Sequence, residues 1–392
     1  MENFNFYSPT EFIFGKQREN ECGSYVKKYG GNKVLIHYGS KSAVESGLLD
    51  RVKASLTKEN IDFVELGGVQ PNPRDTKIYE GIEICRKENV DFILSVGGGS
   101  CIDSSKAIAI GALYDGDFWD FYGTGKIVER ALPIGTVLTI AAAGSEASGG
   151  SVVTKEEGML KRDTGSDLLR PRFSILNPEL TCTLPAYQTA CGVTDIMAHV
   201  FERYFTNTLE VEVTDRLCEG LLLTLLKEAP RVINEPNNYE ARANIMWAGT
   251  VAHNDIVGVG RSQDWNSHAI EHELSGLYDC AHGAGLAVVM PAWMEFVCDH
   301  NVMRFAQMAV RVFGCEMNFE NPKETAMKGI KAFRKFLHEI GMPINFKELG
   351  AREEDIPVLV KNLGIKDKTW GFKPLSAEDV TQILKIAVRA EV

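Results

Sequence analysis

Features that mark several other classes of protein are missing from this 392-residue chain. No apolar run approaches the ~20 residues that a membrane-spanning helix needs. The start, MENFNFYSPTEF, lacks the basic residues and apolar stretch of a signal peptide. None of the nine cysteines stands in a C-x-x-C pair, so neither a zinc ribbon nor a dithiol motif is indicated. We therefore expect a cytoplasmic protein with reduced thiols.

An excess of basic residues is also missing. Lysine and arginine number 42 against 53 acidic residues, which gives a net charge of −11. This balance argues against nucleic acid or an anionic membrane as a partner. It still permits a small anionic cofactor, because backbone N–H groups at a helix N-terminus attract phosphate whatever the net charge. Apolar residues make up 44% of the chain, which is ordinary for a globular protein.

The pattern of apolar residues changes near residue 185. Before it, short apolar runs alternate with segments at helical spacing; the runs are 33–39, 62–66, 91–96, 133–140 and 173–176. Such alternation predicts a parallel sheet with helices on both faces. After it, helical patterns dominate, at 186–206, 212–232, 238–257 and 322–340, and a last helix opens with the capping-box pattern Ser376 to Asp379.

We therefore predict an α/β plus all-α fold. Residues 1–183 form a Rossmann-like α/β domain, and residues 184–392 form a helical domain. Because clefts at domain interfaces are favoured ligand sites, we expect the active site in the cleft between them.

One aspartate and four histidines of the helical half form a candidate metal site. Asp195 and His199 are four residues apart, as are His268 and His272, so each pair lies on one face of a helix. His282 follows ten residues later. A ligand set of one carboxylate and three of these imidazoles would suit Fe²⁺ or Zn²⁺. Spacing alone leaves open the alternative that these are helix-surface or core histidines with hydrogen-bond partners.

A glycine-rich turn ends the third predicted strand and opens a helix. Its sequence is Gly97-Gly98-Gly99-Ser100. Glycines let the backbone approach a pyrophosphate, and the helix N-terminus supplies N–H donors. The motif is not G-x-G-x-x-G, because Ile102 stands where the third glycine would be. The alternative is a turn whose glycines only satisfy backbone geometry.

A second turn, Gly39-Ser40-Lys41, follows the first predicted strand. No Asp or Glu stands at the end of that strand, where a carboxylate would hold a ribose 2′-OH and repel a 2′-phosphate. Gly39, Ser40 and Lys41 instead favour NADP(H) over NAD(H).

Two further motifs have plainer interpretations. Asp103 and Lys106 are three residues apart, and we expect an ion pair on a helix surface. Ser145 in A-G-S-E-A lacks the second flanking glycine of a nucleophile elbow, so we expect a loop that borders the cofactor.

Together these motifs resemble the iron-containing alcohol dehydrogenase family, over nearly the whole chain. The chain looks most similar to the branch of butanol dehydrogenases and NADPH-dependent aldehyde reductases. The residues that carry the resemblance are F-G (14–15), P-N-P (71–73), G-G-G-S-x-I-D-x-x-K (97–106), G-S-E (144–146), R-P-x-F-S-I-L-N-P (170–178), the Asp195/His199 pair, and H-A-I-E-H-E-L-S with His282-Gly283.

The resemblance implies roles for individual residues. Residues 1–183 would bind the dinucleotide and residues 184–392 the metal. The family's metal ligands correspond to Asp195, His199, His268 and His282. His272 corresponds to a catalytic histidine near the nicotinamide and substrate. The cofactor-binding positions are Gly39, Ser40, Asn72, Gly98, Gly99, Ser100, Thr139 and Lys161.

The expected function is that of a metal-dependent alcohol dehydrogenase or aldehyde reductase for small primary alcohols such as butanol. We expect NADP(H) as the favoured cofactor, one Fe²⁺ or Zn²⁺ ion, and a homodimer. Two alternatives remain: a dehydroquinate-synthase-like lyase on the same scaffold, and a non-catalytic member of the fold. The lyase would need Lys and Arg around the metal, and such residues are few between 195 and 282.

Overall fold

The computed structural model describes residues 1–39 and 41–391, which form two compact units. The sheet unit comprises Tyr7–Leu184 and Asn237–Asn254. The helical unit comprises Met1–Phe6, Pro185–Pro236 and the chain from Asp255 onward. The predicted division into 1–183 and 184–392 treats each domain as one continuous segment, whereas each unit here also takes a segment from the other half.

The sheet unit is built on six parallel strands in the order β1-β8-β5-β4-β2-β3. Their bounds are β1 (Glu11–Phe14), β2 (Lys33–Tyr38), β3 (Asp62–Leu66), β4 (Phe92–Gly97), β5 (Ile134–Leu138) and β8 (Phe173–Leu176). Five of them are the predicted strands. The edge strand β1, whose sequence EFIF is one short apolar stretch after ten residues without regular structure, was not predicted.

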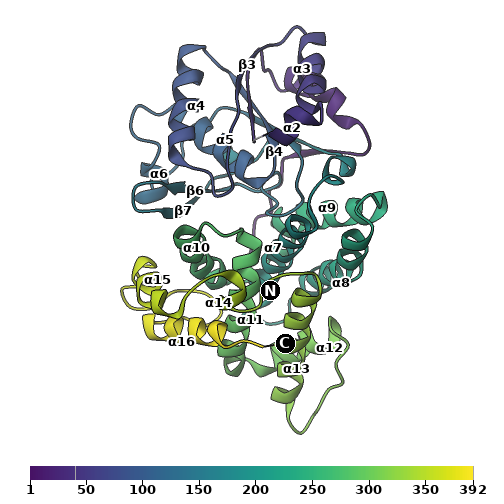
Figure 1. Cartoon of the computed structure of the whole chain (residues 1–392), viewed down its shortest axis with the longest axis vertical. Helices are drawn as coiled ribbons and strands as arrows, with labels where there is room; N and C mark the ends of the chain where they lie inside the picture. Colours follow the sequence, from purple (N-terminus) through teal and green to yellow (C-terminus); the bar gives the residue numbers. More distant parts are fainter. Residues whose placement is uncertain (40, 392) are drawn as a thin grey trace. The chain divides into compact units, whose positions relative to one another are not determined.

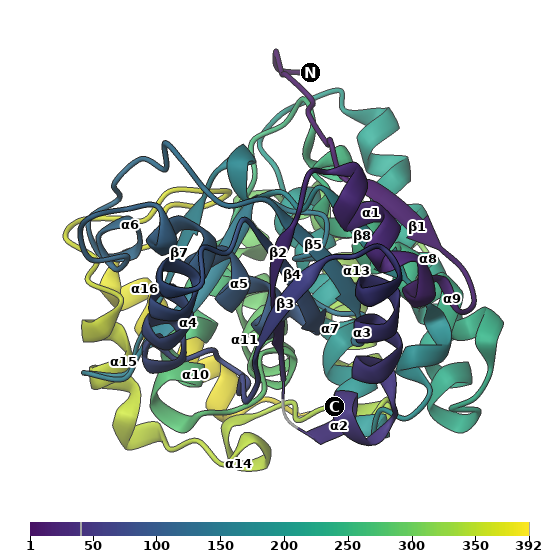
Figure 2. The ribbon, with the colours of Figure 1, turned by 90° about the horizontal axis from the view of Figure 1, so that it is seen from above.

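Successive side chains of a strand point to opposite faces of the sheet and pack into two separate hydrophobic cores. Leu35 of β2 belongs to one core with helices α4 (Asp75–Lys87) and α5 (Gly99–Ala112). Its neighbours Val34 and Ile36 belong to the other core, with α1 (Cys22–Lys28) and α3 (Leu48–Lys58). Successive strand residues point to opposite faces, so both faces of the sheet are covered. Figure 2 shows the sheet between α3 on one side and α4 on the other.

The remaining elements of the sheet unit are short or lie outside the sheet. They are α2 (Lys41–Glu45), α6 (Asp120–Gly123), the antiparallel hairpin β6 (Gly150–Lys155) and β7 (Leu160–Gly165), and α9 (Tyr239–His253). Helix α9 joins this unit through Glu146, whose carboxylate accepts a 2.8 Å hydrogen bond from the Thr250 hydroxyl. Met246 of α9 also packs with Ile102 and Leu138.

The expected surface pair of Asp103 and Lys106 on α5 is wrong. Lys106 is fully buried, and its ammonium donates to the carbonyl oxygens of Ser145, Ser148 and Gly150 at 2.8, 3.0 and 2.6 Å. The Ser145 hydroxyl accepts from Lys106 at 2.8 Å and donates to Asp103 at 2.6 Å. A buried ammonium needs several acceptors, and a loop of inward-facing carbonyls supplies them. These hydrogen bonds from Lys106 and to Asp103 hold the loop of residues 144–150 against α5.

The helical unit contains the helices predicted at 186–206, 212–232 and 322–340, the helix of the His268/His272 pair and the last helix, together with four that the sequence did not reveal. Their bounds are α7 (Ala186–Tyr204), α8 (Glu212–Asn234), α10 (Asn266–Tyr278), α11 (His282–Val297), α12 (Val302–Arg311), α13 (Pro322–Glu339), α14 (Phe346–Leu349), α15 (Ile356–Asn362) and α16 (Ala377–Val388). The capping box at the start of α16 is confirmed, because Ser376 and Asp379 each accept the other's backbone N–H. Across the described residues, no helix is long and apolar enough to cross a membrane.

Candidate metal centre and cofactor-binding turn

Three helices of the helical unit bring the predicted metal ligands together. Asp195 and His199 lie one turn apart on α7, His268 lies on α10, and His282 is the first residue of α11. Figure 1 shows α7, α10 and α11 grouped in this unit. Helix α11 can start this close to α7 because residue 283 is glycine: a Cβ there would lie 2.1 Å from the carbonyl oxygen of Cys191.

Distances between the candidate ligand atoms suit one small cation. Oδ1 of Asp195 lies 3.2 Å from Nδ1 of His199, 3.8 Å from Nε2 of His268 and 3.7 Å from Nε2 of His282. Two ligands held ~2.1 Å from a tetrahedral ion are ~3.4 Å apart. Ligand atoms of Asp195, His268 and His282 all lie within 4.8 Å of one another, and the His199 ring adjoins that of His268 at 4.7 Å.

Two of these atoms are buried polar groups without a hydrogen bond. Oδ1 of Asp195 and Nε2 of His268 have no hydrogen-bond partner among the residues that the structure describes. Their separation of 3.8 Å is too long for a hydrogen bond to each other. Buried polar atoms normally have partners, and a shared cation would satisfy both. The donor set and its geometry therefore fit a divalent metal.

Two buried carboxylates orient the histidines. Nδ1 of His268 donates to Glu202 at 2.7 Å, and Nδ1 of His282 donates to Glu271. Each bond fixes Nδ1 as the donor to a glutamate, so Nε2 is the nitrogen that faces Asp195 and that a metal would bind. Both glutamates have no solvent exposure.

Sequence reasoning missed Glu202 and Glu271, although a signal was present. Each glutamate stands three residues after a candidate ligand, His199 or His268, and therefore on the ligand-bearing side of its helix. Metal-binding histidines commonly donate their second ring N–H to a carboxylate, so acidic residues on that side were worth marking.

The carboxylates favour positive charge at this position. Burial lowers the pKa of His268, but the nearby carboxylates of Asp195 and Glu202 raise it, and the resulting pKa is about 9. A position that holds a proton this firmly also attracts a metal cation.

His272 lies one turn after His268 on α10, half-buried, with its ring 5.6 Å from that of His282. It forms a second possible ligand group with Glu271 and His282. Because Glu271 already accepts from Nδ1 of His282 and from the Ser275 hydroxyl, we assign that carboxylate to orientation rather than to ligation. His272 therefore lies beside the candidate metal ligands.

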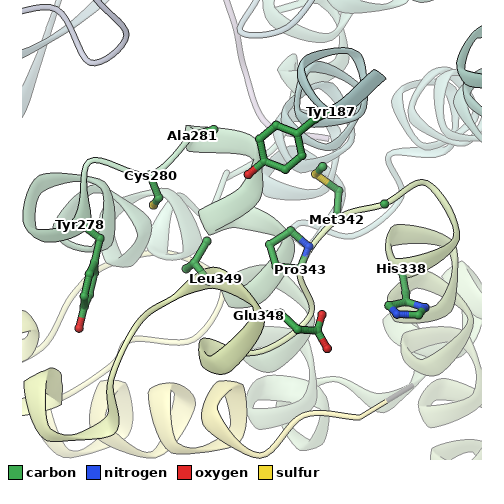
Figure 3. Close-up of a pocket in the computed structure, with 10 residues that line it drawn as sticks. Tyr187, Tyr278, Cys280, Ala281, His338, Met342, Pro343, Glu348 and Leu349 are labelled. Carbon is green, nitrogen blue, oxygen red and sulfur yellow. The ribbon is translucent and has the colours of Figure 1, made fainter. Parts of the chain in front are cut away.

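A separate pocket of about 510 Å³ lies in the same unit. Figure 3 shows Tyr187 of α7, Cys280 and Ala281 on one side of it, and Met342 and Glu348 on the other. Its wall thus includes the turn directly before His282, but the four candidate ligands do not line it.

The expected cofactor residues of the sheet unit gather at the carboxyl ends of adjacent strands. Gly39 follows β2, Gly98 follows β4, and Thr139 follows β5. The chain passes from β2 to β3 on one side and returns to β4 on the other, so the strand order reverses between β2 and β4. Open α/β sheets bind ligands at such a point.

The turn at the start of α5 has the features of a phosphate site. Gly98 is the N-cap, Gly99 and Ser100 begin the helix, and no side chain caps this end. The first N–H groups of a helix have no partner within it, so they remain available to an anion. A Cβ on Gly99 would lie 3.2 Å from that of Ala143, so the glycines also keep the turn open.

Two other expected residues are also placed in the sheet unit. Asn72 lies in the connection between β3 and α4 at a φ of 52°, and Lys161 lies on β7; both are buried. Ser40 lies outside the described residues. Ser145, by contrast, is held between Lys106 and Asp103, which leaves it a structural role in the loop.

Comparisons with known proteins agree over nearly the whole chain. The family model "Iron-containing alcohol dehydrogenase" matches residues 9–178, and "Fe-containing alcohol dehydrogenase family, C-terminal" matches residues 189–388. The probable NADH-dependent butanol dehydrogenase 1 of Bacillus subtilis is 42% identical over 99% of this chain and 100% of its own length. The NADPH-dependent aldehyde reductase YqhD of Escherichia coli is 36% identical over 93% of both chains.

A solved structure gives the same result. The crystal structure of NADH-dependent butanol dehydrogenase A from Thermotoga maritima superimposes with a TM-score of 0.96 at 42% identity, and covers 99% of both chains. Because the family models, the relatives and the solved structure agree on one family over almost every residue, the chain belongs to the iron-containing alcohol dehydrogenases.

Proposed function

We propose that this oxidoreductase interconverts small primary alcohols, such as butanol, with their aldehydes, using one Fe²⁺ or Zn²⁺ ion and NADP(H). The observation that carries the proposal is the convergence of Asp195, His199, His268 and His282, with two of the histidines oriented by buried glutamates. We further propose that the enzyme acts as a homodimer in the cytoplasm. Nine free cysteines accord with a reducing compartment.

The bound metal ion and nicotinamide would supply one part of the proposed chemistry, and the chain's own residues would supply the rest. When bound, the divalent ion supplies a Lewis acid for the alcohol or carbonyl oxygen, and the nicotinamide supplies or accepts the hydride. The chain would hold the ion with a ligand set of single negative charge, so the ion and its four ligands together would carry a charge of +1. Glu202 and Glu271 keep the Nδ1 protons of His268 and His282 in place. His272 is our candidate for moving a proton between the substrate oxygen and solvent, because it lies beside His282.

The choice of NADP(H) rests on the turn after β2. The relatives are named for both cofactors, NADH for the butanol dehydrogenases and NADPH for the aldehyde reductase, so family membership does not decide it. Gly39 places no carboxylate at the end of β2, and Lys41, exposed at the start of α2, supplies a positive charge nearby. A 2′-phosphate would meet no repulsion here.

The alternative of a lyase acting on a phosphorylated, carboxylated substrate is less well supported. That substrate needs free cationic side chains near the metal. Arg203 donates to the carbonyl oxygen of His199 at 2.9 Å and pairs with Asp255. Arg261 is buried and donates to Asp215 at 2.7 Å. Both arginines therefore serve the protein's own structure.

The test combines metal analysis with turnover. The purified protein should contain close to one Fe²⁺ or Zn²⁺ per chain and should consume NADPH when butanal is added. His268→Ala should lose most of the metal and activity while its circular dichroism stays unchanged. His338→Ala, at an exposed position, is the matched control. Full metal occupancy in His268→Ala would contradict the ligand assignment, and NADPH that is recycled without net consumption would favour the lyase.

A further inference from the structure

Trp265 immediately precedes the helix that carries His268, and its backbone is unusual. Its φ is 146° and its ψ is 7°, at the N-cap of α10. A bulky residue rarely adopts positive φ, and such strain persists only where surrounding contacts enforce it. Strained residues of this kind cluster at functional sites.

The contacts that enforce this backbone come from both sides of Trp265. The N–H of Asp264 donates to the carbonyl oxygen of Glu202 at 2.8 Å. The carboxylate of Asp264 accepts the N–H of Asn266 at 2.7 Å and the N–H of Phe372 at 2.6 Å. The residues on either side of Trp265 are therefore fixed by the same buried carboxylate.

The last of these contacts requires glycine at position 371. Gly371 has a φ of 117°, and a Cβ on it would lie 2.3 Å from Oδ2 of Asp264. The segment of Gly371 and Phe372 can approach Asp264 only because this side chain is missing. A segment distant in sequence thus takes part in holding the start of α10.

The indole ring that this backbone presents lies against two of the candidate ligands. Its centroid is 5.8 Å from the ring of His199 and 5.2 Å from the ring of His268, both in edge-to-face geometry. The guanidinium of Arg203 also lies over the indole ring, 4.7 Å from its centroid. The same guanidinium donates to the backbone of His199. Aromatic and cation–π contacts of this type restrict ring orientation.

We propose that Trp265 is a positioning residue of the metal centre: its ring fixes the imidazole planes of His199 and His268, and the contact of Asp264 with the Gly371-Phe372 segment holds the ring in place. The glutamates fix which nitrogen of an imidazole faces the metal, and the indole fixes the tilt of the ring. This inference rests on the proposed metal site.

The experiment titrates metal-free protein with Co²⁺ alone and records two signals. The visible absorption of bound Co²⁺ reports ligand geometry, and tryptophan fluorescence reports an indole near the ion. Trp265→Ala should weaken Co²⁺ binding by about tenfold or more, in the range seen when groups that orient metal ligands are removed, and should change the visible spectrum. Trp265→Phe keeps an aromatic ring, so it should retain the spectrum and affinity of the parent while losing most of the Co²⁺-dependent fall in fluorescence.

The matched control is Trp119→Phe, because Trp119 is half-buried like Trp265 but lies in the sheet unit, against Phe118 and Tyr122. It should behave as the parent in both signals. Should Trp265→Ala fail to fold, Gly371→Ala tests the same inference, since displacing Asp264 should alter the Co²⁺ spectrum with every aromatic residue still present.

Parental affinity and spectrum in Trp265→Ala would overturn the inference and leave the metal site standing. An unaltered spectrum in Gly371→Ala, together with full quenching in Trp265→Phe, would overturn it as well. A parent protein that binds no Co²⁺ would overturn the proposed metal site, and the inference with it.

Discussion

Glu202 holds His268 by two hydrogen bonds at once. Its carboxylate accepts the ring Nδ1–H at 2.7 Å and the backbone N–H at 3.1 Å. One buried carboxylate therefore fixes both the imidazole of His268 and the backbone of α10 at this residue. Such a carboxylate also makes the imidazole more basic and a stronger ligand.

Replacing that charge should weaken metal binding without abolishing it. Glu202→Gln keeps the size of the side chain but removes the carboxylate, so metal affinity should fall about 10- to 100-fold. Competition with a chelator of known affinity measures the change. Glu228→Gln is the matched control, because Glu228 is also buried but pairs with Arg231 on α8. Equal affinities in the two variants would contradict the role given to Glu202.

Lys106 should be essential to stability. Lys106→Met leaves the carbonyl oxygens of Ser145, Ser148 and Gly150 without their donor and removes the positive charge near the Asp103 carboxylate. Removing one partner of a buried charged network costs about 3–5 kcal/mol. Urea unfolding followed by circular dichroism measures the loss, with the exposed Lys87→Met as control. A variant as stable as the Lys87 control would show that the loop at 144–150 is held by other contacts.

Lys106 also shows where sequence reasoning stops. Periodicity located five strands of the parallel sheet and the long helices α7, α8 and α13, because each has a regular apolar pattern. The spacing of Asp103 and Lys106 carried no information about burial, since a surface pair and a buried network have the same spacing. Only the packing of β6 and the 144–150 loop onto α5 decides between them.

The candidate metal site was likewise predictable only in part. The two i, i+4 pairs and His282 marked the candidate residues, because residue type and helical spacing both suit a metal, and the choice of four ligands among them rests on the family resemblance. Pairing Glu202 with His268 could not be predicted, since it joins α7 to α10. Helix α11 was missed because it is apolar on all sides, and a fully buried helix has no periodic pattern.

Acid should destabilise the sheet unit through His37. This buried imidazole is bonded to the carbonyl oxygen of Leu66 at 2.9 Å and the Ser104 hydroxyl at 2.8 Å, and burial lowers its pKa to about 4. Below its unfolded pKa of ~6.5 the unfolded chain takes up a proton that the folded chain excludes. Stability should therefore fall as the pH drops from 6.5 to 4, by about 3 kcal/mol from this residue.

The comparison uses metal-free protein, so that loss of metal at low pH does not contribute. His37→Gln should lose less stability between pH 7 and pH 5 than the parent, by about 2 kcal/mol. Urea midpoints at the two pH values measure this. His338→Gln, at an exposed position, should follow the parent. The assignment is wrong if His37→Gln and the parent show the same acid sensitivity.

Cofactor preference should be controlled at the end of β2. A Cβ added to Gly39 would meet only Sγ of Cys101 at 3.5 Å and the carbonyl oxygen of Val69 at 3.8 Å, which are ordinary contacts. Gly39→Asp is therefore sterically acceptable, and its effect will come from charge. The carboxylate would accept hydrogen bonds from the ribose diol of NADH and repel the 2′-phosphate of NADPH. Preference should shift toward NADH by at least about tenfold, or ~1.4 kcal/mol.

The measurement is kcat/KM for NADPH and NADH with butanal, in the parent, Gly39→Asp and Gly39→Ala. The alanine variant fills the same space without charge, so it should keep the preference of the parent. A shift in Gly39→Asp alone would show that electrostatics at this turn selects the cofactor. A parent enzyme that already prefers NADH would contradict the NADP(H) assignment. An aspartate variant with unchanged preference would mean that the adenosine ribose does not lie at the end of β2.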